Sequence, residues 1–245
     1  MRHQSVYSSR AKIGLITPPT NTVNEAEWAR MMPPGVTFHT HRMPLHPPAQ
    51  TPEEMASFHA ELDANFRLLA QARVDVIAYA CTGGSMVTPA SSMPEAVEQR
   101  TGLSAVTTAA AVVEATERVN AKRVSVITPY GDGVNDHEAE FLRGNGIEPL
   151  AINGLGIVIK SPADIPKLSQ TKLTDVRALA EQTFAPGSEA LLITCTDFPS
   201  LPLIPELEEM LGVPVISSNT ATLYACLRKA GINDQIANSG VLLTL

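Results

Sequence analysis

Two stretches of this chain share one pattern, a short apolar run that ends in Cys-Thr. The first is Val74–Ser85, in which the run stops at Cys81 and a threonine and two glycines follow. The second is Leu191–Asp197, in which Cys195 takes the same place. A short apolar run bounded by turn residues is typical of a buried strand of a parallel sheet. Each thiol is therefore predicted at the carboxyl end of a strand, where open α/β sheets bind their ligands.

The two stretches belong to an internal duplication of the chain. Lys12–Pro18 matches Arg123–Pro129 at an offset of 111 residues, and Gly102–Thr108 matches Gly212–Ser218 at an offset of 110. The two cysteines lie 114 residues apart. Three matches in the same order and at nearly one spacing indicate two βαβ-type halves rather than a solenoid of short repeats.

We predict an α/β fold made of two Rossmann-like (flavodoxin-like) halves, each a short parallel sheet flanked by helices. The first half is predicted over residues 1–120, completed by a C-terminal helix over 219–245, and the second over 121–218. A pseudo-twofold axis between the halves would make the two cysteine turns face each other across a cleft, which is a common place for a small ligand. The proline-rich segment Pro44–Pro52 is predicted to be a surface loop.

Composition narrows the classes of partner. The chain has 245 residues and a net charge of −7, which argues against nucleic acid and an anionic membrane surface. No apolar run approaches the length that spans a membrane, and the sequence start lacks an apolar segment. Three cysteines without metal-type spacing do not suggest a disulfide framework. We expect a cytoplasmic protein with reduced thiols.

Two thiols on opposite faces of a small carbon acid suit two kinds of chemistry. They can remove a proton on one face and deliver one on the other, or one thiolate can add to a carbon–carbon double bond while the second group assists. Either route develops negative charge on a substrate carboxylate, which requires donors fixed in advance. Helix N-termini at the two turns are expected to lower the thiol pKa values. The candidate binding residues are Asn21, Thr82, Gly83, Tyr130, Thr196 and Asp197.

Some of these residues also fit a purely structural role. A lone cysteine is more often a buried apolar residue, and Cys226, within a predicted helix, is assigned to packing. Two cysteines at equivalent positions of a duplication favour a functional role. His39, His41 and His46 have no accompanying cluster of acidic or cysteine ligands, so neither a metal nor a cofactor is predicted.

Several motifs resemble the aspartate/glutamate racemase superfamily, and most closely its branch of maleate cis-trans isomerases and arylmalonate decarboxylases. The segments that carry the resemblance are Ile16–Thr22 with Glu25 and Glu27, Phe38–Met43, Asp75–Cys81, Thr128–Tyr130 and Cys195. The resemblance covers nearly the whole chain. It implies a homodimer or higher homo-oligomer that acts on a small carboxylate without cofactor or metal.

For the site, the resemblance implies that Cys81 adds to the double bond of maleate, and that rotation and elimination then release fumarate. Cys195 would act as the partner acid and base, while Asn21, Tyr130 and the turn amides bind the two carboxylates. Three alternatives stay open: a two-thiol racemase of an amino acid or related carbon acid, a decarboxylase of the arylmalonate type, and a non-catalytic binding protein. Arylmalonate decarboxylases keep only the second cysteine, and the Asp-Ser-Gly motif of racemases is missing here.

Overall fold

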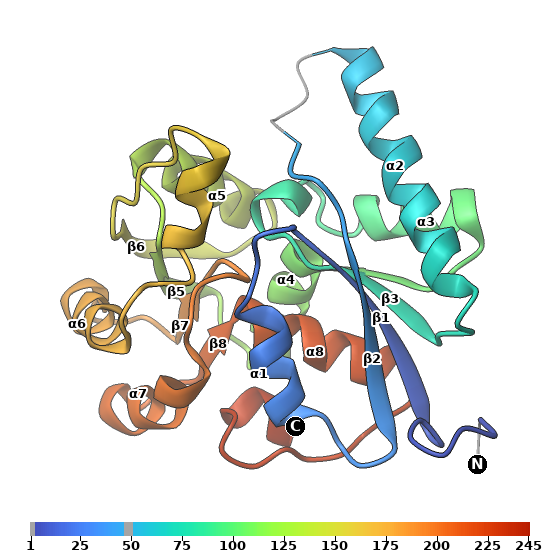
Figure 1. The fold of residues 1–245 in the computed structure, drawn as a ribbon. Coiled ribbons are helices and arrows are strands. Elements are labelled where there is room, and N and C mark those ends of the chain that lie inside the picture. The colour runs from blue at the N-terminus through green and yellow to red at the C-terminus, as the bar shows by residue number, and fades with distance from the viewer. Residues whose placement is uncertain (1–2, 47–50) are drawn as a thin grey trace.

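The computed structural model describes residues 3–46 and 51–245, and within them two parallel four-stranded sheets are flanked by helices (Figure 1). Strand order is β2-β1-β3-β4 in one sheet and β6-β5-β7-β8 in the other. Adding four to each strand number of the first order gives the second, as expected for a duplication. The predicted fold class is confirmed. Part of the predicted loop 44–52, residues 47–50, lies outside the described residues.

The first sheet and its helices come from the N-terminal half of the chain. Helix α2 illustrates how local sequence sets an element: Thr51 and Glu54 form a capping box, and Pro52 occupies the first turn. Its buried face carries Leu62 and Phe66 against the sheet. The elements are β1 (Ala11–Thr17), α1 (Asn24–Met31), β2 (Val36–Arg42), α2 (Pro52–Ala70), β3 (Val76–Tyr79), the 3₁₀ turn η1 (Gly83–Ser85), α3 (Ser92–Thr101), β4 (Ala105–Thr107) and α4 (Thr108–Arg118).

The second sheet repeats this plan. Gly102 and Gly212 hold equivalent places after α3 and α7, with φ angles of 71° and 69°, and end their helices in the left-handed conformation that glycine tolerates. The elements are β5 (Arg123–Thr128), α5 (Asp132–Gly144), β6 (Glu148–Gly154), η2 (Pro162–Lys167), α6 (Leu173–Thr183), β7 (Ala190–Ile193), η3 (Leu201–Leu203), α7 (Ile204–Leu211), β8 (Val215–Ser217), α8 (Ser218–Lys229) and η4 (Val241–Thr244).

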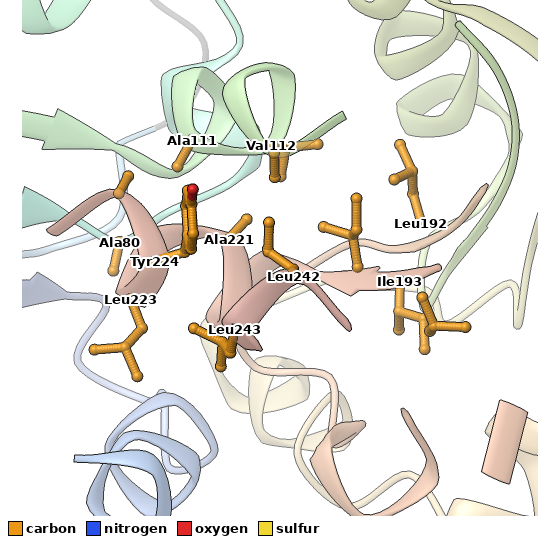
Figure 2. Packing of buried hydrophobic residues seen from close by; sticks show 14 of the residues in the cluster. Ala80, Ala111, Val112, Leu192, Ile193, Ala221, Leu223, Tyr224, Leu242 and Leu243 are labelled. Carbon is orange, nitrogen blue, oxygen red and sulfur yellow. The ribbon is translucent and has the colours of Figure 1, made fainter. Parts of the chain in front are cut away.

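Helices α4 and α8 join the two halves. Small side chains such as Ala111 and Ala221 belong to the packed cluster between them (Figure 2), and Thr222 Oγ1 donates to Thr108 Oγ1 at 3.0 Å. The same cluster reaches Leu192 on β7, so one apolar core extends across both halves. Helix α8 consequently lies in the centre of the molecule (Figure 1), with its first residues next to the ends of both sheets.

The predicted C-terminal helix over 219–245 is shorter than expected. Helix α8 ends at Lys229, because Gly231 adopts a φ of 75° that breaks the helical path. The chain then closes with η4, whose Leu242 and Leu243 are buried in the shared core. The division of the chain into halves at residue 120 stays a prediction.

Candidate active site

The two cysteine turns lie at the same edge of their respective sheets. Cys81 follows the end of β3 by two residues, and Cys195 follows the end of β7 by two residues. Strands β3 and β7 hold equivalent places in the two sheet orders. All three thiols of the chain are free, and the third, Cys226, is fully buried in α8 as a packing residue.

The structure brings both thiols and one predicted ligand together. Tyr130 lies close enough to Cys195 and Cys81 that ionisation of either thiol would raise the pKa of its phenol. The charge of Cys81 likewise acts on Cys195. Each residue comes from a different strand end, so the sheets converge on one site.

Burial, not a helix terminus, dominates the ionisation of the thiols. Burial raises the pKa of Cys81, although hydrogen bonds from the Gly84 N–H and from Tyr79 oppose it. Burial raises the pKa of Cys195 to about 12, against the opposing hydrogen bonds of Tyr130 and of the Asp197 N–H. The expectation of lowered pKa values was wrong, because the packed halves remove water from the thiolates and few donors replace it.

A serine that sequence reasoning missed connects the two turns. Ser218, the first residue of α8, accepts a hydrogen bond from the Cys195 N–H at 3.1 Å. Its hydroxyl also shares a hydrogen bond of 2.9 Å with Thr82 Oγ1. Cys195 has a φ of 110°, an unusual conformation for a residue with a side chain, so its N–H contact helps to fix the turn.

Asn21 and Thr196 form a second connection between the halves. Asn21 Nδ2 donates to Thr196 Oγ1 at 3.0 Å, and that hydroxyl donates to the Ala80 carbonyl at 3.1 Å. Asn21 Oδ1 accepts the N–H groups of Val23 and Asn24 at the start of α1. Among the described residues, the hydrogen bond to Thr196 uses one of the two Nδ2 hydrogens of Asn21.

Asp197 is an acidic residue next to Thr196 in the second cysteine turn. Its Oδ1 accepts the Thr22 N–H at 3.0 Å, and its Oδ2 is buried with no partner among the described residues. Burial raises the pKa of Asp197 to about 6, which the N–H groups of Thr22 and Val23 and the charge of Arg42 oppose.

A buried carboxylate from the first half holds the second turn. Glu27 Oε1 accepts the N–H groups of Ser200 and Leu201, each at 2.8 Å. Its Oε2 accepts Asn219 Nδ2 at 2.7 Å, and the same amide nitrogen donates to the Thr196 carbonyl at 3.2 Å. Burial raises the pKa of Glu27, and these three hydrogen bonds oppose the rise. The family resemblance included Glu27, but its contacts depend on a loop more than 170 residues away.

Glu138 is a second buried acid near Cys195. It lies on α5, is only 1% exposed, and its Oε2 has no hydrogen-bond partner within the described part of the chain. Burial raises its pKa to about 7, and the nearby Thr194, the residue before Cys195, opposes the rise. Its charge reaches Tyr130. Glu138 is one acidic residue in a polar stretch of the sequence, and nothing in that pattern predicts its burial.

A cavity of about 750 Å³ opens beside Cys81. Gly83, Gly84 and Tyr79 line it next to the thiol, and its wall is otherwise mainly apolar. The apolar lining residues are Leu45, Met55, Phe58, Met86, Val87, Met93 and Ala96. Another cavity, of about 680 Å³ between α3, α4 and α8, contains neither active-site cysteine.

The described residues contain neither a metal-binding cluster nor a membrane-spanning helix. Over residues 3–46 and 51–245, no group of three or more His, Cys, Asp or Glu side chains is arranged to hold a metal ion. Within the same ranges, every helix is too short or too polar to cross a membrane.

Comparisons with known proteins agree with this geometry. The model of the arylmalonate decarboxylase family matches residues 13–243. The maleate isomerase of Geobacillus stearothermophilus is 26% identical over 95% of this chain and 97% of its own. The solved maleate isomerase of Pseudomonas putida S16 with maleate superposes with a TM-score of 0.84 at 26% identity, covering 96% of this chain and 97% of the other.

One solved structure bears on the thiols directly. It is a variant of the Nocardia farcinica maleate cis-trans isomerase with a covalently bound succinylcysteine intermediate. It superposes with a TM-score of 0.83 at 28% identity, over 96% of this chain and 98% of the other.

Proposed function

The chain belongs to the arylmalonate decarboxylase family, and from that premise we propose that it is an isomerase that converts maleate to fumarate by cysteine addition. The observation that carries the proposal is the pair of thiols at equivalent strand ends of one site. Cysteine-mediated cis-trans isomerisation is the chemistry of its maleate isomerase relatives, one of which forms a succinylcysteine. Decarboxylation is the less favoured reading.

The reaction begins with addition of Cys81. Its thiolate forms a C–S bond to one olefinic carbon of maleate, and the π electrons move toward the other carbon and its carboxylate. Cys195, whose pKa is about 12, is protonated near neutral pH and donates its proton to that second carbon. The product is a succinyl adduct on Cys81 and a thiolate on Cys195, so protons and electrons balance.

Rotation and elimination complete the cycle. The former double bond is now single, so the two carboxylates turn to opposite sides. The Cys195 thiolate then removes the proton it gave, the C–S bond breaks, and fumarate leaves with Cys81 restored as the thiolate. When its hydroxyl is not held by a substrate carboxylate, the neighbouring Tyr130 offsets part of the cost of that buried thiolate.

The carboxylates are assigned to donors on both turns. Asn21 contributes its second Nδ2 hydrogen, and Tyr130 contributes its hydroxyl. Backbone N–H groups complete the set, because they bind anions without the cost of a mobile side chain. The proposed backbone donors are those of Thr82, Gly83, Thr196 and Asp197.

The decisive experiment follows maleate in deuterated buffer by proton NMR, with wild type, Cys81→Ser and Cys226→Ser. We expect fumarate from the wild type and from Cys226→Ser, the matched packing cysteine, and none from Cys81→Ser. An unchanged maleate signal with folded wild-type protein would overturn the proposal. The same assay on aspartate, glutamate and arylmalonates reports α-deuterium uptake for a racemase and loss of CO₂ for a decarboxylase.

Cys195→Ser tests the second half of the mechanism. With water supplying the proton for addition but no base in place to remove it, the succinyl adduct on Cys81 should accumulate, and intact-protein mass spectrometry should show the added mass of one maleic acid. Full turnover by Cys195→Ser would refute its role as acid and base.

The proposal includes a cytoplasmic homodimer that needs no cofactor. The family resemblance supports the dimer, three free thiols are compatible with a reducing compartment, and side chains of the chain itself supply each chemical step. Light scattering coupled to gel filtration measures the oligomeric state. Full activity after metal removal and dialysis is the result expected of an enzyme that needs no cofactor.

A further inference from the structure

Tyr79 is the last residue of β3, two positions before Cys81. Its side chain is 6% exposed, and its ring packs edge-on against Phe58 with centroids 5.9 Å apart. Its hydroxyl lies beside the Cys81 thiol and interacts with it electrostatically. Tyr79 and Cys81 also both line the cavity of about 750 Å³. A buried phenol thus meets the reacting sulfur where a ligand can reach it.

The backbone at Gly84 shows how closely these two groups converge. A Cβ at this position would lie 2.6 Å from Tyr79 Oη and 3.0 Å from Cys81 Sγ. The first distance is shorter than real Cβ contacts and the second is tighter than nearly all of them, so a side chain here would force the phenol and the thiol to move. At the neighbouring Gly83, a Cβ would meet nothing within 4 Å.

The duplication shows that packing alone does not require a phenol here. The residue equivalent to Tyr79 before Cys195 is Ile193, which is fully buried at the end of β7. An aliphatic side chain therefore completes this strand end in the other half. A buried hydroxyl is costly unless it has a hydrogen-bond partner, and the polar group that lies beside this one is the Cys81 thiol.

We propose that Tyr79 is a catalytic residue of the isomerase reaction, whose hydroxyl donates a hydrogen bond to the Cys81 thiolate when it attacks and when it leaves. The inference rests on the proposed function. It gives each thiol its own phenol, Tyr79 for Cys81 and Tyr130 for Cys195, although the two tyrosines come from different positions of the repeat.

The chemistry favours a donor that never loses its proton. Burial, with the nearby charges of Cys81 and Glu61, raises the pKa of Tyr79 well above its ordinary value, so the phenol stays a donor throughout the working range. Together with the Gly84 N–H it provides two donors to a sulfur that has lost its water. A hydrogen bond to an ion is about twice as strong as one between neutral groups. The titratable and charged side chains around the adjoining cavity are His46, Glu54, His59 and Arg100.

Tyr79→Phe tests the proposal, because it removes the hydroxyl and keeps the ring against Phe58. The rate of iodoacetamide alkylation of Cys81 is measured as a function of pH by peptide mass spectrometry. In Tyr79→Phe the midpoint of this pH dependence should lie at higher pH than in wild type. With maleate, kcat should fall about 10- to 100-fold at pH 7 with little change in KM. Tyr224→Phe, at a buried tyrosine stacked under Arg228 on α8, is the matched control and should behave as wild type.

Alkylation separates this inference from the proposed function, since it needs no maleate. An unshifted alkylation profile in folded Tyr79→Phe would overturn the role of Tyr79, whatever the substrate is. A shifted profile in a protein that does not act on maleate would uphold Tyr79 and refute the isomerase assignment. If the phenylalanine variant does not fold, Tyr79→Ile, which copies the equivalent Ile193, replaces it under the same criteria.

Discussion

Glu138→Gln should make the protein more stable at pH 8 and change its stability much less at pH 5. Glu138 is buried, and its pKa in the folded protein is about 7, whereas its ordinary value is 4.5. Between these two values the folded protein keeps the proton and the unfolded chain has lost it, so stability falls as pH rises. The contribution is fully present below pH 4.5 and is lost above about pH 7. Glutamine stays neutral and removes this dependence.

The size of the effect follows from the same two values. A difference of one unit between the folded and unfolded pKa values is worth about 1.4 kcal/mol, so the rise of the Glu138 pKa from 4.5 to about 7 corresponds to about 3 kcal/mol. Between pH 5 and pH 8, about 2 to 3 kcal/mol of this is expected, because the unfolded chain is already partly ionised at pH 5. That is a large part of the stability of a typical domain.

Urea unfolding at pH 5 and pH 8, at one ionic strength, measures the free energy of unfolding of each variant. The unfolding free energy of Glu138→Gln minus that of wild type should increase by about 2 to 3 kcal/mol from pH 5 to pH 8. Glu140→Gln, at an exposed position of the same helix, is the matched control. An equal difference at both pH values would refute the reasoning, because it would mean that Glu138 ionises alike in the folded and unfolded states.

Two further substitutions test the geometry of the turns. Gly84→Ala should abolish activity and block alkylation of Cys81, because a Cβ there would lie 3.0 Å from the Cys81 Sγ. Gly83→Ala, where a Cβ would meet nothing within 4 Å, should be tolerated. Equal activities of the two variants would contradict this packing. Glu27→Ala should cost about 3 kcal/mol or more and lower kcat, because it leaves two buried N–H groups without an acceptor. Glu25→Ala, which removes a partly exposed ion pair on the same helix, should cost less than about 1 kcal/mol. Thermal unfolding and maleate turnover measure both, and equal losses at the two glutamates would contradict the account.

The sequence was sufficient to predict the fold because its signals are local and repeated. The run before Cys81 and the run before Cys195 each identify a strand, and the constant offset between the halves predicts a second sheet like the first. The strand ends place both thiols at equivalent edges before any tertiary contact is known. Tyr79 was also accessible to this reasoning, because alternation along a strand places it on the face of Cys81.

The ionisation of the site was not predictable in the same way. The argument from helix N-termini considers a thiol and its own turn, whereas the pKa of Cys195 depends on water excluded by the packing of both halves. The partners of the turn hydroxyls are equally remote, since Thr82 pairs with Ser218, which lies 136 residues further along the chain. Only the tertiary structure determines which of these hydroxyls remain available to a ligand.

These remote contacts explain why a duplicated chain would need both halves for one reaction. Helix α8 follows the last strand of the second sheet, and its first residue, Ser218, bonds both to Thr82 of the first turn and to the backbone of Cys195 in the second. Glu27 reaches in the opposite direction and holds the loop after Cys195 from the first half. Neither turn keeps all of its hydrogen bonds when the halves separate. The site therefore depends on the interface itself, and substitutions that loosen the packing of α4 against α8 should reduce turnover before they unfold either sheet.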